Sequence, residues 1–207
     1  MRVRKKRVSD KIYLLKFDNQ REMAKTLLRF QEYYECPVHK GKIFTLEEYK
    51  KWYKKENSGR FSYYKDWDGF NFPSRVLKPF YDGKFDPLSK EEKKILHLFR
   101  NAKGNYYIIA VAGKKHEHKH VLKHELAHSL FYVNPKYKKK VLGVIKEYEG
   151  ELEHVKNEIL SRLGYSEEVL EDEIHAYSVS LFNELKSDMP AGFRKKIRKL
   201  FHSHVHS

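Results

Sequence analysis

The stretch that decides the fold begins with Tyr106-Tyr-Ile-Ile-Ala-Val-Ala112 and leads, after a short polar segment, to His124-Glu-Leu-Ala-His128. The first part is short, β-branched and aromatic, which predicts a strand. Gly113 ends it. From about Lys119 onward the apolar residues recur at helical spacing, and Asn134-Pro135 closes that helix. A buried strand followed at once by a helix is therefore the centre of the predicted fold.

The helix contains the pattern H-E-x-x-H. Residues four positions apart lie on the same face of a helix, so the imidazoles of His124 and His128 can point at one metal ion. Glu125, next to the first histidine, can reach a water molecule at that ion and act as a general base. The chain has 12 His, and its composition predicts only roughly 0.07 chance matches to the pattern. The pattern therefore indicates a metal site.

With this strand and helix, residues 105–185 resemble the zincin superfamily of zinc metallopeptidases. The resemblance implies an α+β catalytic half in which Tyr106–Ala112 is an edge strand that binds extended substrate, followed by the active-site helix. It also implies Zn²⁺ as cofactor, a peptide or protein substrate, and peptide-bond hydrolysis with Glu125 as general base. A zinc hydrolase that acts on a non-peptide amide is the alternative within the same chemistry.

A catalytic zinc ion has three protein ligands and one open position. We expect the third ligand in Glu171-Asp-Glu-Ile-His-Ala-Tyr177. In the glutamate-type branch of the superfamily, the gluzincins, it is a Glu on a later helix, and Glu173 fits because it shares a face with the packed side of the helix. Glu171 and Asp172 lie nearer the exposed first turn, where acids interact with the helix dipole. His175 is the rival third ligand.

Tyr177 stands where the gluzincin pattern usually has an Asp that supports a zinc histidine, so the chain departs here from the thermolysin-like branch. A tyrosine there could stabilise the oxyanion or could belong to the core. The segment His116-Glu-His-Lys-His120 offers a possible second metal site, or a slipped His120/His124 pair, although a solvated polar loop is the plainer interpretation.

The remaining chain is expected to form one α+β domain over 1–207. Its parts are an N-terminal half of helices and strands (1–103), the zincin-like half (104–186) and a basic C-terminal helix with its tail (187–207). Capping patterns and apolar spacing predict further elements: a strand at 12–17 and helices at 19–34, from Thr45, from Ser89, over 136–160, from Ser166 and from Pro190. The aromatic segment 61–73 is expected to be a loop with its rings under the core, or else the lining of a cleft.

The net charge is +15, with Lys spread along the whole chain and three denser basic runs at Arg2–Arg7, Lys136–Lys140 and Arg194–Lys199. Such runs can contact nucleic acid or acidic partners, and a basic nucleic-acid-binding protein with structural histidines is the non-enzymatic alternative. A peptidase that acts on nucleic-acid-bound proteins would combine both functions. A solvated surface is the plainer interpretation.

The chain has a single cysteine, Cys36, and therefore no intrachain disulfide. The basic start at Arg2–Arg7 precedes an apolar run too short for a signal peptide. No run of apolar residues is long enough for a membrane span. We therefore expect a cytoplasmic protein.

Overall fold

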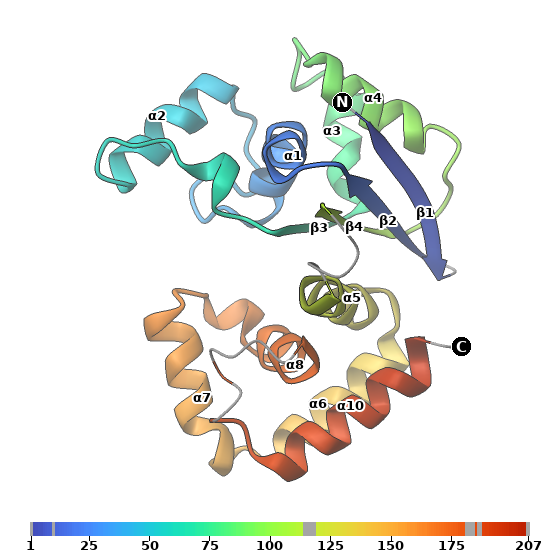
Figure 1. Ribbon diagram of the computed structural model, residues 1–207, viewed down its shortest axis with the longest axis vertical. Coiled ribbons are helices and arrows are strands. Elements are labelled where there is room, and N and C mark those ends of the chain that lie inside the picture. Colours follow the sequence, from blue (N-terminus) through green and yellow to red (C-terminus); the bar gives the residue numbers. More distant parts are fainter. Residues whose placement is uncertain (1, 10, 114–118, 181–184, 186–187, 206–207) are drawn as a thin grey trace. The chain divides into compact units, whose positions relative to one another are not determined.

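The structure is a computed structural model that describes residues 2–9, 11–113, 119–180, 185 and 188–205. The chain divides into two compact units, Met1–His118 and Lys119–Ser207, which are described in turn (Figure 1). The α+β class expected from the sequence is confirmed. The zincin-like arrangement, and the grouping of 104–186 as one half of a single domain, stay predictions.

Unit 1 contains a mixed sheet with the strand order β1-β2-β4-β3. The strands are β1 (Val3–Ser9), β2 (Ile12–Phe17), β3 (Gly69–Pro73) and β4 (Tyr107–Ala112). β1 pairs antiparallel with β2, β2 pairs parallel with β4, and β3 pairs antiparallel with β4. The predicted strands at 12–17 and 106–112 are thus confirmed.

β4 is an interior strand, because β2 and β3 pair with it on its two sides. The prediction that Tyr106–Ala112 is an edge strand is therefore wrong. Every residue of β4 is buried, and an unbroken apolar run without polar alternation is typical of a strand covered on both faces. At the outer strand β3, the Asn71 N–H donates to Gln31 Oε1 of the neighbouring helix at 3.0 Å.

The sequence interpretation missed β1 and β3 for different reasons. β1 carries the basic run Arg4–Arg7 and is mostly exposed. Its consecutive charged residues do not alternate with apolar ones, so the sequence does not show the pattern of a strand. It is held by backbone pairing with β2, and its charges suit an exposed edge. β3 alternates buried Phe70 and Phe72 with Asn71, but a period of two over so few residues is a weak signal.

The helices of unit 1 are α1 (Gln20–Glu35), α2 (Leu46–Glu56), α3 (Lys78–Tyr81) and α4 (Lys90–Phe99). Asn19 caps α1 by accepting from the Glu22 N–H at 2.9 Å. Thr45 with Glu48, and Ser89 with Glu92, form complete capping boxes at α2 and α4. The predicted starts of these helices are confirmed, because a capping box depends only on residues three positions apart.

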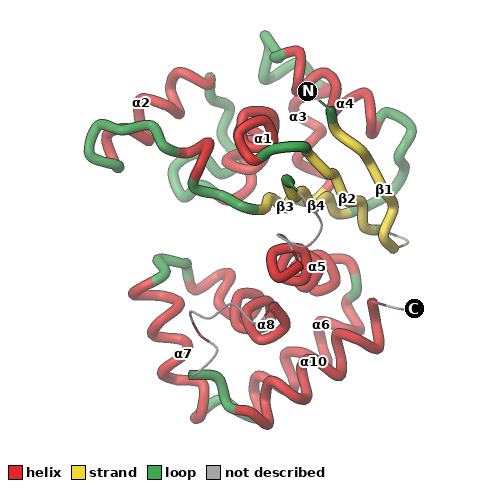
Figure 2. The backbone as a smooth tube through the Cα atoms, viewed as in Figure 1, coloured by secondary structure: helices red, strands yellow, loops and turns green. Residues whose placement is uncertain are grey.

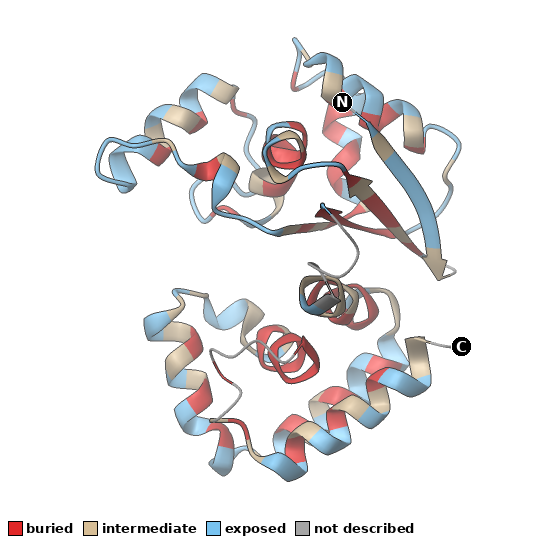
Figure 3. Cartoon of the chain, viewed as in Figure 1, coloured by how far each residue is buried: buried red, intermediate tan, exposed pale blue. Residues whose placement is uncertain are grey.

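Aromatic side chains form much of the core of unit 1. Phe30 of α1 stacks on Phe72 at 5.7 Å and on Phe80 at 4.1 Å between ring centroids. Within the segment 61–73, Tyr63, Phe70 and Phe72 are buried, as expected for rings that pack under the core, whereas Trp67 is exposed and residues 69–73 form β3 instead of a loop. Figure 3 shows the buried residues on the inner sides of the helices and on the sheet.

A buried ion pair joins two helices of this unit. The Arg29 guanidinium of α1 donates from two nitrogens to the Glu92 carboxylate of α4, at 2.7 and 2.6 Å. Arg29 also donates to the Phe85 carbonyl at 3.0 Å. Both side chains are below 10% exposed, so neither charge is compensated by water.

Unit 2 is helical within its described residues (Figure 2). Its helices are α5 (Lys119–Val133), α6 (Pro135–Glu147), α7 (Glu153–Asn157), α8 (Leu170–Ser180) and α10 (Ala191–Val205). The predicted helix over 136–160 is interrupted: α6 ends at Glu147, a short 3-10 turn follows, and a π-helical turn succeeds α7. Ser166 precedes the helical turn before α8 but makes no side-chain capping bond. Among the described residues, no helix is long and apolar enough to cross a membrane.

We predict that Arg29→Met destabilises the chain by about 3–5 kcal/mol, because it leaves the Glu92 carboxylate buried without its partner. Adding Glu92→Gln removes that charge and keeps an oxygen for the capping box of α4, so the double variant should recover part of the loss. Urea unfolding of both variants measures this. A double variant less stable than the single one would contradict the assignment.

A half-buried acid of unit 1, Glu32, makes stability depend on pH. Tyr63 donates its hydroxyl to Glu32 Oε1. Burial raises the pKa of Glu32 from its ordinary value of 4.5 to about 7, outweighing the hydrogen bonds from Tyr63, Tyr49 and Cys36 that lower it. The folded chain therefore keeps a proton that the unfolded chain releases at lower pH.

We predict that the stability contributed by Glu32 is full below pH 4.5 and declines as the pH rises to about 7. The difference between these two pKa values corresponds to roughly 3 kcal/mol. Glu32→Gln keeps an oxygen acceptor for Tyr63 without a titrating group, so it should lack this decline. Unfolding free energies of both proteins at several pH values test this, and identical pH profiles would refute it.

Candidate metal centre

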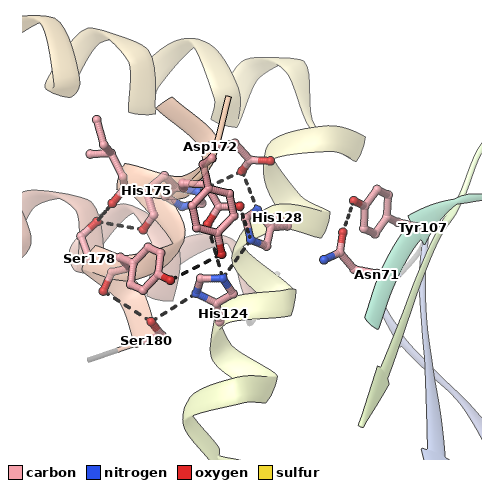
Figure 4. A network of polar contacts seen from close by, with 12 residues as sticks. Asn71, Tyr107, His124, His128, Asp172, His175, Ser178 and Ser180 are labelled. Carbon is pink, nitrogen blue, oxygen red and sulfur yellow. Dashed lines mark hydrogen bonds and ion pairs between the residues drawn. The ribbon is translucent and has the colours of Figure 1, made fainter. Parts of the chain in front are cut away.

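The candidate site lies between α5 and α8, which pack against each other in unit 2. His124 and His128 are one turn apart on α5, and α8 contributes Asp172, Glu173 and His175. Figure 4 shows the side chains of the two helices directed toward one another. Helical spacing alone brings the two histidines together, whereas the acids reach them only through the packing of the helices.

Three side chains offer one ligand atom each within 4.8 Å of one another: His124, His128 and Glu173. The Nε2 atoms of the two histidines are 3.0 Å apart. Glu173 Oε2 lies 3.7 Å from His124 Nε2, and Glu173 Oε1 lies 3.6 Å from His128 Nε2. Ligands at 2.0–2.1 Å around a tetrahedral ion are about 3.3–3.4 Å apart. The three residues could therefore hold a metal ion.

The burial of these residues supports the same interpretation. His124, His128 and Glu173 are 9%, 5% and 7% exposed. Glu173 Oε2 has no hydrogen-bond partner among the described residues, although it is fully buried. Leaving a carboxylate oxygen buried and unsatisfied is costly. A cation beside it would supply the missing interaction.

The electrostatics of the cluster show strongly coupled groups. Burial raises the pKa of Glu173 to about 7. Burial and the adjacent His128 hold the pKa of His124 well below its ordinary value. Burial also acts to lower the pKa of His128, but the carboxylates of Asp172 and Glu173 raise it well above its ordinary value. His124 is thus kept neutral and able to act as a ligand. The protonated form of His128 is instead stabilised by the neighbouring carboxylates.

Asp172 has a role that the sequence interpretation missed. Asp172 lies in the first turn of α8, as expected, but its Oδ1 is also 3.0 Å from His128 Nδ1, a contact that the sequence did not predict. Burial acts to raise the pKa of Asp172, yet His128 and His175 lower it below its ordinary value. A carboxylate behind a ligand histidine fixes its ring and tautomer. In the sequence, only the position of Asp172 next to the candidate ligand Glu173 could have indicated this role.

His175 is directed away from the two imidazoles. Its Nε2 lies 2.7 Å from the Tyr137 hydroxyl, and its ring stacks on Phe131. Its Nδ1 is 3.9 Å from Asp172 Oδ1. The structure therefore brings Glu173, and not the rival His175, to His124 and His128.

Tyr177 and Ser180 surround His124. The Tyr177 ring stands edge-on to the His124 ring, with centroids 5.0 Å apart, and its hydroxyl is 3.4 Å from that of Tyr165. Ser180 Oγ is 3.4 Å from His124 Nδ1. Tyr177 is therefore next to a candidate ligand, which is compatible with both roles considered for it.

Glu125 is also buried, at 6% exposed. Its negative charge raises the pKa of His128 and of Glu173, so its carboxylate acts on the same cluster. His120, by contrast, is bonded through Nδ1 to the Ser180 carbonyl at 2.7 Å. It does not belong to the candidate metal group. His116 and His118 lie outside the described residues.

Comparison with known proteins identified no relative: no family model, no curated protein and no solved structure matches the chain.

We predict that Asp172→Ala weakens binding of Zn²⁺, used as a probe, by about 10–100-fold, because His128 loses the group that orients it. Asp172→Asn should recover part of this affinity, since its amide oxygen can still accept from His128. Competition with a chromophoric chelator measures the dissociation constants. Glu171→Ala, at an exposed position of the same helix, is the matched control. Equal losses in Asp172→Ala and the control would contradict the role of Asp172.

Proposed function

We propose that this chain is a zinc-dependent hydrolase of peptide bonds, with Zn²⁺ held by His124, His128 and Glu173 and with Glu125 as general base. The observation that supports this most strongly is the buried, unsatisfied Glu173 Oε2 facing the two histidines of the H-E-x-x-H helix. A cation bound beside His124 and His128 would give this buried oxygen a partner.

The donor set favours zinc over Ca²⁺ and Mg²⁺. Two imidazole nitrogens and one carboxylate oxygen are typical ligands of catalytic zinc sites. Ca²⁺ and Mg²⁺ instead prefer shells made of oxygen. A zinc ion bound here would polarise the scissile carbonyl and make a water molecule acidic near neutral pH.

The residues of the chain then have separate tasks. Glu125 takes a proton from the attacking water and returns it to the leaving amine. Its buried position keeps the carboxylate out of bulk solvent, which strengthens its interactions with charged groups. Asp172 holds the His128 ring through Nδ1, so that Nε2 faces Glu173. Asp172 is thus a positioning residue.

Tyr177 is proposed to act at the same site. Its ring packs on His124, and a phenolic hydroxyl is a suitable donor to an oxyanion. The substrate is proposed to be a peptide or protein, and a non-peptide amide is the alternative. A panel of unstructured peptides and small amides would distinguish the two substrate classes.

We predict that Glu125→Gln keeps bound zinc but loses peptide hydrolysis by a factor of at least about 100, because only the base is removed. Glu173→Gln should lose both zinc and activity. Metal content per chain and cleavage of a fluorogenic peptide library report the two properties. Near wild-type cleavage by Glu125→Gln would exclude Glu125 as the base. Full zinc content in Glu173→Gln would exclude Glu173 as a ligand.

A further inference from the structure

Two of the three basic runs come together on one surface of unit 2. Lys136–Lys140 lies on α6 and Arg194–Lys199 lies on α10, more than fifty residues later in the chain. Figure 1 shows these helices side by side. We call the outward sides of α6 and α10 the basic helix pair.

Contacts along their length establish that the two helices are antiparallel. Near the start of α6, Tyr137 packs on His204, with ring centroids 4.9 Å apart. Beyond the end of α6, Tyr148 packs on Phe193 at 5.7 Å, and the Lys196 ammonium pairs with the Glu147 carboxylate. The exposed lysines of the two helices therefore form one basic strip, apart from Lys138, whose ammonium lies over the Phe131 ring of α5 at 4.5 Å from its centroid.

The charge on this strip is large and almost unopposed within it. The two helices contain ten Lys or Arg and one acidic residue, Glu147, which is a formal +9 of the chain's +15. The five lysines of α6 are exposed, as are Lys195, Lys196 and Lys199 of α10. Lys136 with Lys140, and Lys195 with Lys199, are like-charge pairs one turn apart, which destabilise a helix. Solvation alone gives no reason for this placement.

The acidic residues of unit 2 are separated from the basic helix pair along the chain. Ten of its thirteen Asp and Glu residues fall within 147–173, and α10 has none. Of the other three, Glu125 belongs to the metal centre, while Glu184 and Asp188 precede α10, so Glu147 is the single acid within the two helices. A strip with one sign of charge attracts polyanions and raises their local concentration.

The apolar residues of these helices exclude two other kinds of partner. Phe193, Ile197 and Phe201 of α10 are buried, and the exposed large apolar side chains of the described residues all lie outside α6 and α10. A helix that enters a membrane surface needs an apolar face for the lipid. A tight protein interface needs buried aromatic or aliphatic anchors. Neither is present on the outward sides.

We propose that the basic helix pair binds the phosphate backbone of nucleic acid without reading its sequence. Lysine ammonium groups suit this role because they contact phosphates as point charges. The strip spans about 20 Å, from the rise of a helix of this length, and a duplex carries one phosphate charge per about 1.7 Å of axis. Several phosphates therefore face the lysines at once. This inference does not depend on the proposed hydrolase activity.

The test compares two variants of equal net charge in the full chain. The first carries Lys136→Gln, Lys140→Gln, Lys195→Gln and Lys199→Gln. Gln and Lys have similar helix propensities, so α6 and α10 should persist. The matched control carries Lys51→Gln, Lys55→Gln, Lys90→Gln and Lys93→Gln, four exposed positions on α2 and α4. Fluorescence anisotropy with a labelled duplex of mixed sequence, between about 50 and 200 mM salt, gives the affinities.

We expect wild type and control to bind with an affinity that falls steeply with salt. The first variant should bind at least about 10-fold more weakly at low salt, with a slope of log affinity against log salt that is less steep by up to about 3.6. A scrambled duplex should bind equally well. Equal losses in both variants, no binding by wild type, or stronger capture of polyglutamate or anionic vesicles than of the duplex would each overturn the proposal. Circular dichroism confirms that both variants are folded.

Discussion

The packing of α5 against α8 brings together three imidazoles and three carboxylates, and the electrostatic balance of this group is the constraint on which unit 2 depends. Ionisable groups removed from water must be paired or neutralised. Here Asp172 offsets His128 at 3.0 Å, and Tyr137 satisfies one nitrogen of His175. Glu173 retains an unsatisfied oxygen. Asp172 Oδ1 and His175 Nδ1 likewise have no hydrogen-bond partner among the described residues, so the balance is incomplete both at the converging ligand atoms and beside them.

The adjacent acids Asp172 and Glu173 of α8 contact different groups, because successive residues of a helix point in directions about 100° apart. Glu173 faces both Nε2 atoms, whereas Asp172 reaches the Nδ1 side of His128. One turn of helix thereby provides a candidate ligand and the group that orients another ligand. The gluzincin pattern has its supporting Asp four residues after the ligand Glu, and in this chain that position is Tyr177, which packs on His124 instead.

Charge is distributed in opposite ways inside and outside this unit. Acids concentrate around the buried histidines and in the segment that precedes α8, while α6 and α10 carry exposed lysines. The apolar residues of α10 are used inside, against the body of the unit. One face of α10 therefore stabilises the fold, while its other face carries charged side chains. The proposed hydrolytic site and the proposed nucleic-acid surface are thus made of different residues.

Local chemistry was predictable from the sequence by itself. Capping boxes at Thr45 and Ser89, the strand at 12–17 and the pairing of His124 with His128 each depend on residues within about one turn or one strand. Only the tertiary structure decided the rest, because it depends on contacts between distant segments. β2 and β3 enclose β4 and make it an interior strand. The packing of α8 on α5 turns Asp172 toward His128, and the antiparallel pairing of α6 with α10 joins two basic runs into one surface. Spacing along a chain fixes which side chains share a face, but it carries no information about which other face they meet.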